Sequence, residues 1–217
     1  MLFVCLGSLL AACRPRAALP ALDESTPPAV FREQVTAATT TDLPLGEGIQ
    51  RGTCPAQVDD HPTPYFNDRV LIRLPKGATE DNFVEMAPMF ARNFEPIESI
   101  NCEAGAPGAM IDYMALTVLQ DDDKPLETMR DELLVAFGYP AEVRLVEHDT
   151  DGPRRSGMWV YDVPATPDKP TPARALLALR VESGMVAVTL FEVHPDAWPT
   201  IVNTLVASAA RVSVLRY

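Results

Sequence analysis

The chain has 217 residues, of which 47% are hydrophobic, and this is enough for one globular domain with a sizeable core. Its 18 Lys and Arg residues against 30 Asp and Glu residues give a formal net charge of −12 at pH 7. Binding to nucleic acid needs a basic surface, so this charge excludes nucleic acid as an expected partner.

The first residues of the chain differ in character from the rest. The run LFVCLGSLLAA at positions 2–12 is apolar, but it is shorter than the roughly 20 residues that a membrane-spanning helix needs. It has the length of the apolar region of a signal peptide, and it ends in small residues. Residues 1–12 are therefore predicted to be a signal peptide. The alternative is that a hydrophobic strand or helix of the fold lies here.

The segment Leu10-Ala11-Ala12-Cys13 matches a lipobox, which is an apolar residue, two small residues and a cysteine. In this segment the chain resembles a bacterial lipoprotein precursor, although no Lys or Arg precedes Cys13. The resemblance implies cleavage before Cys13, a diacylglyceryl thioether on its sulfur and a fatty acyl chain such as palmitate on its new amino group. Arg14 follows, where Asp favours the inner membrane, so the resemblance implies an outer-membrane lipoprotein that faces the periplasm.

Residues 13–50 are predicted to be the lipidated cysteine and a flexible tether. From residue 14 onward this segment is rich in Ala, Pro and Thr and shows no sustained hydrophobic period. Such a segment cannot bury enough apolar area to offset the entropy lost on ordering. A short helix near 29–37 is the alternative within it. Residues 51–217 are predicted to form a single domain.

The cysteines are consistent with export from the cytoplasm. Cys5 lies in the predicted signal peptide and Cys13 would carry the lipid, which leaves Cys54 and Cys102. An even pair in an exported chain suggests a disulfide, and two unpaired thiols are the alternative. Neither cysteine lies in a CxxC motif, so a redox-active site is not expected.

Regular patterning begins near residue 65. A strand is predicted over 69–74, where Pro75-Lys76-Gly77 ends it. A helix that Pro88 kinks or divides is predicted over 83–94. It rests on apolar residues at helical spacing: Phe83, Met86, Ala87, Phe90 and Phe94. Strands are predicted over 97–102 and 110–119.

The second half of the chain alternates between hairpins and helices. Its predicted elements are a helix over 125–137, strands over 142–148 and 157–163 joined at Asp151-Gly152, a surface loop over 164–172, two strands within 173–193 joined at Ser183-Gly184, a helix from Pro195 with Trp198 inward, and a last edge strand over 212–215. This order predicts the α+β class, with an antiparallel sheet built from hairpins and helices packed on it.

The region 69–215 resembles the PsbP/Mog1-like architecture. The resemblance rests on RVLIRLPKG at 69–77, GMWVYDV at 157–163 and the hairpin and helix LLALRVESGMVAVTLFEVHPDAWPTIVNTLVASAARV at 176–212, in which Ser208 lies near the helix end. PsbP domains serve photosystem assembly and Mog1 binds a small GTPase, so the resemblance implies a fold and no single function. It supplies no ligand-binding residue.

No metal or cofactor is expected. His61, His148 and His194 lie on three different elements and lack the spacing of a zinc site. Asp149-Thr150-Asp151-Gly152 is similar to the start of a calcium loop, but position 12 of that loop would be Val160 rather than Glu.

The acidic run Asp121–Asp123 could recruit a divalent cation, but it is more typical of a loop before a helix N-terminus. Ser156, Ser183 and Ser208 lack a G-x-S-x-G motif, and no glycine-rich phosphate loop is present. No catalytic residue is therefore predicted, and we expect the protein not to be an enzyme.

Three aromatic residues, Trp159, Tyr161 and Trp198, could line a ligand cavity, although such residues more often complete a sheet–helix core. The predicted function is a non-enzymatic binding or assembly module, anchored to the membrane by lipid and bound to another envelope protein. The alternative is a lipoprotein that binds a small molecule or lipid in a pocket between the sheet and the C-terminal helix around Trp198. A hydrolase with carboxylate or metal chemistry is the least supported reading.

Overall fold

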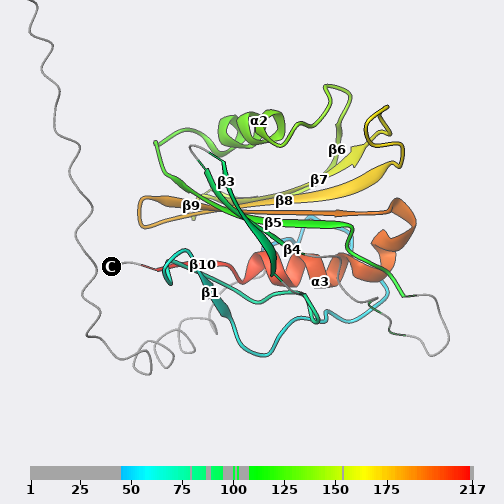
Figure 1. Ribbon diagram of the computed structural model, residues 1–217, viewed down its shortest axis with the longest axis horizontal. Helices are drawn as coiled ribbons and strands as arrows, with labels where there is room; N and C mark the ends of the chain where they lie inside the picture. The colour runs from blue at the N-terminus through cyan, green and yellow to red at the C-terminus, as the bar shows by residue number, and fades with distance from the viewer. Residues whose placement is uncertain are drawn as a thin grey trace, which may run out of the picture. The chain divides into compact units, whose positions relative to one another are not determined.

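A seven-stranded antiparallel sheet is the centre of the fold (Figure 1). In this computed structural model the described residues are 45–78, 80–86, 89–94, 100, 102, 108–152 and 154–215, and no side chain is described within 80–86 and 89–94. All of them belong to one compact unit, Asp42–Tyr217. The predicted signal peptide, Cys13 and most of the predicted tether lie outside the described residues.

The strand order of this sheet is β3-β4-β5-β9-β8-β7-β6, so that β8 and β9 lie near its middle. In chain order its strands are β3 (Glu80–Met86), β4 (Met89–Phe94), β5 (Tyr113–Gln120), β6 (Arg144–Asp151), β7 (Ser156–Val163), β8 (Ala173–Glu182) and β9 (Met185–Val193). Long hairpins without crossovers explain why the strands from β6 to β9 occupy neighbouring positions.

A second, three-stranded sheet brings together the first two strands of the described chain and the last one. Its order is β1-β2-β10, with β1 at Thr63–Tyr65, β2 at Val70–Ile72 and β10 at Ser213–Val214. Pro64 lies in β1, which pairs only with β2, and an edge strand tolerates a proline because one side of it needs no donor.

Successive residues of the central strands point to opposite faces of the large sheet, and both faces are covered. Leu176 is paired with Phe191 and faces one apolar cluster, whereas Leu177 is paired with Leu190 and faces the other. Figure 1 shows one helix, α2, on one face and α3 on the other. Burial on both faces explains why β8 and β9 are apolar along most of their length.

The helix α2 (Leu126–Ala136) follows Pro125 and buries one stripe of side chains: Leu126, Met129 and Leu133. The helix α3 (Trp198–Ala210) follows a short 3-10 helix, η1 (Pro195–Ala197), and is mostly buried. No helix within the described part of the chain is both long and apolar enough to cross a membrane.

The α+β class is confirmed, and most predicted elements are present within a few residues of their expected bounds. These are the helices α2 and α3, the hairpins β6–β7 and β8–β9, the strand β5, the loop between β7 and β8, and the short strands β2 and β10. The strand β10 is an edge strand, as predicted, and it lies at the edge of the small sheet, where it pairs with β2.

The predicted helix over 83–94 is wrong. The chain forms the strands β3 and β4 there, with Met86 paired to Met89, and β4 also pairs with β5. Pro88 would interrupt a helix in this region. As a six-residue strand, β4 instead forms backbone hydrogen bonds with β3 on one side and with β5 on the other. Apolar residues at three-residue and four-residue intervals therefore did not decide the local structure.

The predicted strand over 97–102 is described only at Ile100 and Cys102. Ile100 forms an isolated antiparallel bridge with Ala109, with backbone hydrogen bonds of 2.7 and 2.8 Å in the two directions. The other residues of that prediction and of the turn after it lie outside the described residues, except Gly108.

Candidate functional site

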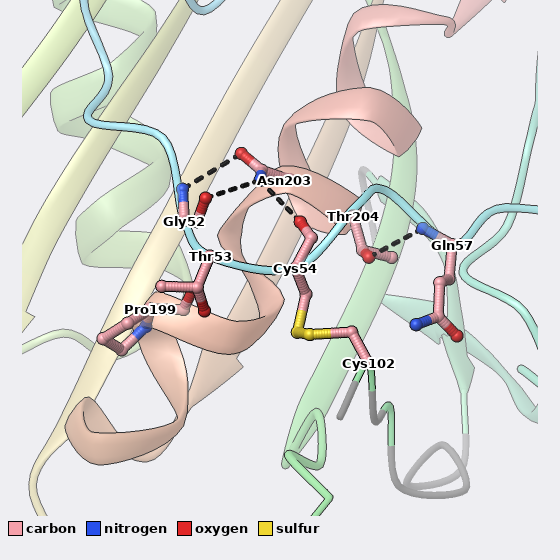
Figure 2. The surroundings of a disulfide bond; sticks show 8 residues. All are labelled: Gly52, Thr53, Cys54, Gln57, Cys102, Pro199, Asn203 and Thr204. Carbon is pink, nitrogen blue, oxygen red and sulfur yellow. Dashed lines mark hydrogen bonds between the residues drawn. A yellow bond between two sulfur atoms is a disulfide. The ribbon is translucent and has the colours of Figure 1, made fainter. Parts of the chain in front are cut away.

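The first described residues, 45–57, begin with a turn at 45–48 and then lie along α3; we call this segment the strap. Asn203 of α3 holds it: its Nδ2 donates to the carbonyls of Gly52 (3.0 Å) and Cys54 (2.6 Å), and its Oδ1 accepts from the Gly52 amide at 3.1 Å (Figure 2). A buried backbone outside a sheet must find other partners, and the side-chain amide supplies both a donor and an acceptor.

Further hydrogen bonds hold the strap to α3 and to the edge strand β6. The Thr53 amide donates to the carbonyl of Pro199 at 2.8 Å, and the Gln57 amide donates to the hydroxyl of the fully buried Thr204 at 3.0 Å. Toward its start, the Gln50 amide donates to Glu147 at 2.8 Å, and the Gly46 amide donates to Asp149. The strap therefore covers part of the edge strand β6, at residues 147–149, which could otherwise pair with another chain.

Glycine allows the strap to lie this close. A Cβ at Gly52 would lie 2.2 Å from the carbonyl oxygen of Pro199, and a Cβ at Gly48 would lie 2.3 Å from that of His148. Both distances are far below van der Waals contact, so only glycine fits at either position.

The predicted disulfide is present in the structure. Cys54 and Cys102 are bonded with their Cα atoms 5.5 Å apart, and 48 positions separate them in the sequence (Figure 2). Cys54 is buried in the strap, whereas Cys102 is exposed and follows the bridge at Ile100. The disulfide thus joins the strap covalently to the segment that precedes β5.

A groove of about 450 Å³ lies beyond the ends of β7 and β8, close to the start of α3. Its apolar lining is Val163, Pro164, Pro172, Ala173 and Pro195, and its charged lining is Glu142, Arg144, Asp162 and Arg174. We refer to these nine residues as the groove.

Three charged residues of the groove are neighbours across adjacent strands. Asp162 is paired with Arg144 of β6 on one side and with Arg174 of β8 on the other. Its carboxylate accepts from Nη2 of Arg144 at 2.9 Å and from Nε and Nη2 of Arg174 at 2.9 and 2.7 Å. The guanidinium of Arg174 also lies 5.7 Å from the centre of the Trp198 ring.

Partial burial alone would raise the pKa of Asp162, but the hydrogen bonds and charges of Arg144 and Arg174 outweigh it and lower that pKa. Asp162 is therefore ionised at neutral pH. Two guanidinium groups around one carboxylate leave a net positive charge at this point of a strongly acidic chain.

A second polar cluster fixes the loop between β7 and β8. Glu192 of β9 is 8% exposed, accepts from the Tyr139 hydroxyl at 2.6 Å and is paired with Lys169 of the loop. Burial and the charge and hydrogen bond of Glu192 raise the pKa of Tyr139, so its hydroxyl stays a donor. The loop carries Pro164 and Pro172, so this cluster also holds one wall of the groove.

The structure does not bring together the three aromatic residues predicted as cavity lining. Trp159 and Tyr161 are 1% and 3% exposed in the cluster under α2, whereas Trp198 is 4% exposed in the cluster under α3, across the sheet. The interface between the sheet and α3 is filled by Trp198 and by the other inward side chains of the helix, Ile201, Val202, Leu205 and Val206. Each aromatic residue is therefore part of a packed core.

The histidines lie as the sequence suggested. His61 and His148 are exposed, and Nδ1 of His194 accepts from the Asp196 amide at 3.3 Å at the start of η1. No group of three or more His, Cys, Asp or Glu side chains within the described ranges could hold a metal ion.

The acidic runs have structural partners. Asp149 accepts from the strap, and Asp121 forms an ion pair of 2.7 Å with Arg155.

The residues of the groove were not predicted from the sequence. Arg144, Asp162 and Arg174 are far apart in the chain, and each reads as an ordinary polar residue in or beside an apolar strand. Only the strand register places them in one row. The only signal was proline content, because Pro164 follows β7, Pro172 precedes β8 and Pro195 begins η1.

Comparisons with known proteins support the fold. No protein-family model matches the chain, and no curated protein matches it. The structure is similar to the Ran-binding protein Mog1p of Saccharomyces cerevisiae, with a TM-score of 0.52 and 11% sequence identity over 73% of this chain and 96% of that chain. A mutant of Mog1 gives a TM-score of 0.52 and 11% identity over 72% and 96% of the two chains.

Cyanobacterial PsbP (CyanoP) from Synechocystis sp. PCC 6803 is 12% identical over 78% of this chain and 99% of that chain, with a TM-score of 0.43. At the identity shared with Mog1p, similarity establishes a fold and not a function. The chain thus has the α+β fold of the Mog1/PsbP-like type, as its sequence predicted.

Proposed function

We propose that this protein is a lipid-anchored protein of the bacterial envelope whose α+β domain acts as a non-enzymatic binding or assembly module for another envelope protein. The observation that carries the binding role is the fold shared with Mog1p, which is named as a Ran-binding protein. The lipobox at Leu10–Cys13 supports the anchor, and Arg14 after it supports the location at the outer membrane, facing the periplasm.

Two features of the described domain fit an exported and tethered protein. A disulfide such as Cys54–Cys102 is typical of oxidising compartments outside the cytoplasm. The strap, 45–57, includes the last residues of the segment predicted as the tether, and Asn203 and the disulfide both fasten it. A tether would therefore join the domain at a point that is well fixed to α3.

The alternative, a pocket for a small molecule or lipid between the sheet and α3, has no observation in its favour. Trp198 and the apolar side chains around it fill that interface. We therefore keep the binding module as the proposal.

The anchor can be tested by labelling cells with a clickable palmitate analogue. Label is expected in the wild-type protein and absent from Cys13→Ser. Cys5→Ser is the matched control, because it removes another cysteine of the same N-terminal run and should keep the label. Persistent label in Cys13→Ser would contradict the anchor.

The binding role can be tested by cross-linking intact envelopes, solubilising them in detergent and purifying the tagged protein. A partner in stoichiometric amount is expected, and the same tag on an unrelated lipoprotein serves as the control. Recovery of the protein alone, at every cross-linker concentration that preserves its fold, would refute the binding role.

A further inference from the structure

We infer that the groove is a docking surface for an extended peptide segment of the partner protein, in which one acidic side chain lies beside apolar side chains. This inference rests on the proposed function and names the surface and the chemistry of recognition. Its argument follows from the lining, the charge and the rigidity of the groove.

The apolar part of the groove fits an extended segment. Pro164, Pro172 and Pro195 present rigid rings and no backbone N–H donors, and Val163 and Ala173 complete the wall. A volume of about 450 Å³ lies at the small end of the roughly 300–1,000 Å³ range of ligand pockets. The groove therefore has room for a few side chains of a peptide and not for a folded element.

The charged part of the groove favours a carboxylate. The side chain of Arg144 is 75% exposed, and among the described residues only its Nη2 is bonded, to Asp162. A guanidinium has five N–H donors in a planar fork that matches a carboxylate, so Arg144 still has donors for a second carboxylate.

The charges also limit how acidic the segment can be. Arg144 and Arg174 exceed Asp162 by one positive charge, but the exposed Glu142 also lines the groove, so its four charged residues sum to zero. The rest of the chain is strongly acidic and repels polyanions. One carboxylate that reaches Arg144 is therefore favoured over a run of acidic residues.

The groove is formed before a ligand binds. Asp162 fixes both arginines, Arg174 lies over Trp198, and the pair of Lys169 with Glu192 fixes the loop that carries Pro164. A preformed surface loses little conformational entropy on binding, which helps a short segment to bind with useful affinity.

The test is a selection of random peptides displayed on phage against the purified full chain, followed by titration of synthetic copies of the selected peptides. We expect the peptides to share one Asp or Glu beside apolar residues. Binding should weaken at least about tenfold in Arg144→Glu, and less in Arg144→Lys, which keeps the charge but not the fork. Arg154→Glu is the matched control, because Arg154 lies at the β6–β7 turn, at the far end of these strands, and its binding should be unchanged.

Selection of no peptide, selection of peptides without a carboxylate, or binding to Arg144→Glu as tight as to the wild type would each overturn the inference. Thermal unfolding of the variants shows whether Arg144→Glu is folded, and Arg144→Lys keeps the test valid if it is not. Selected peptides that match this chain itself, together with concentration-dependent dimers in light scattering, would show a second copy as the occupant and would also overturn it.

The envelope purification separates this inference from the proposed function. If the wild type and Arg144→Glu recover the same partner equally well, the binding role stands and the groove is not the docking surface. If neither recovers a partner while the peptides still bind the wild type and not Arg144→Glu, the groove binds as inferred and the proposed role in the envelope fails.

Discussion

Tyr139 and Tyr161 show how much one hydroxyl partner matters under α2. The Tyr139 hydroxyl donates to Glu192 at 2.6 Å. The Tyr161 hydroxyl is buried and has no hydrogen-bond partner within the described part of the chain. A buried hydroxyl that lacks a partner costs free energy, whereas one bonded to a carboxylate contributes to stability.

Tyr161→Phe is therefore expected to leave the free energy of unfolding unchanged or to raise it by about 1 kcal/mol. Tyr139→Phe, the matched substitution, is expected to lower it by about 1–2 kcal/mol because Glu192 loses a donor. Urea unfolding at neutral pH measures both. A larger loss in Tyr161→Phe than in Tyr139→Phe would show that the Tyr161 hydroxyl has a partner after all.

Tyr161 also predicts how the free energy of unfolding depends on pH in alkaline solution. Burial, helped by Asp131 and opposed by Arg130, raises the pKa of Tyr161 from 10.0 to about 12. Above pH 10 the unfolded chain loses this proton while the folded chain keeps it, so the contribution is complete below pH 10 and is lost as pH rises toward 12.

We therefore expect the unfolding free energy of the wild type to fall between pH 10 and 12, and to fall less steeply in Tyr161→Phe. Tyr113 and Tyr139 also have raised pKa values, so some decline should remain in the variant. Urea midpoints at several pH values measure the slope. Equal slopes in the two proteins would contradict the assignment to Tyr161.

At the scale of elements, the strap combines apolar burial with close backbone contact. Leu45 and Ile49 are buried in the core, and backbone amides of the strap donate to side chains of α3 and of the edge strand β6. Such contacts require a backbone that can approach without a Cβ, which Gly52 provides.

Gly52→Ala is expected to destabilise the protein by at least about 2 kcal/mol, because its Cβ would clash with Pro199 and Val202 and displace the strap from Asn203. Gly152→Ala is the control, since a Cβ there would meet nothing within 4 Å. Thermal unfolding and hydrogen exchange of the strap amides measure the effect. Equal stability of the two variants would mean that the strap can shift at little cost.

At the scale of the whole molecule, the disulfide closes a loop that contains the entire small-sheet hairpin β1–β2 and the strands β3 and β4. The strands β1 and β2 are short and belong to the small sheet, and β3 and β4 are the last two strands at one end of the large sheet. None of them lies between two central strands of the large sheet. A cross-link that limits the freedom of this loop in the unfolded chain should therefore contribute much of the stability of this part of the fold.

The double variant Cys54→Ser/Cys102→Ser is expected to lose about 4 kcal/mol of unfolding free energy, on the chain-entropy model for a loop of this length. Dithiothreitol should lower the melting temperature of the wild type and leave that of the double variant unchanged. A wild type insensitive to dithiothreitol under unfolding conditions would argue against the disulfide.

Much of the fold could be read from the sequence because its local signals agree with its tertiary structure. The turns at Asp151-Gly152 and Ser183-Gly184 lie between long β-forming runs, and both hairpins were predicted. The helix predicted over 83–94 was wrong because the apolar spacing there fits a helix, whereas pairing with β5 and the proline at 88 favour strands.

Of the candidate site, only the disulfide could be predicted from the sequence. Two cysteines remained after the N-terminal ones were assigned, and the structure joins them. Arg144, Asp162 and Arg174 could not be grouped, because their proximity depends on the register of three strands, and a shift of one residue would turn Asp162 to the opposite face.

The sequence by itself determined the α+β class and the two hairpins of the second half, since these depend on residues that are neighbours in the chain; the lipid anchor at Cys13 stays a prediction. Only the tertiary structure decided that 83–94 forms two strands, that Trp159 and Trp198 lie on opposite faces of the sheet, and that three charged residues meet in one groove. The physical reason is that strand register, helix position and sheet edges depend on contacts between residues distant in sequence, and local patterns carry no information on those distances.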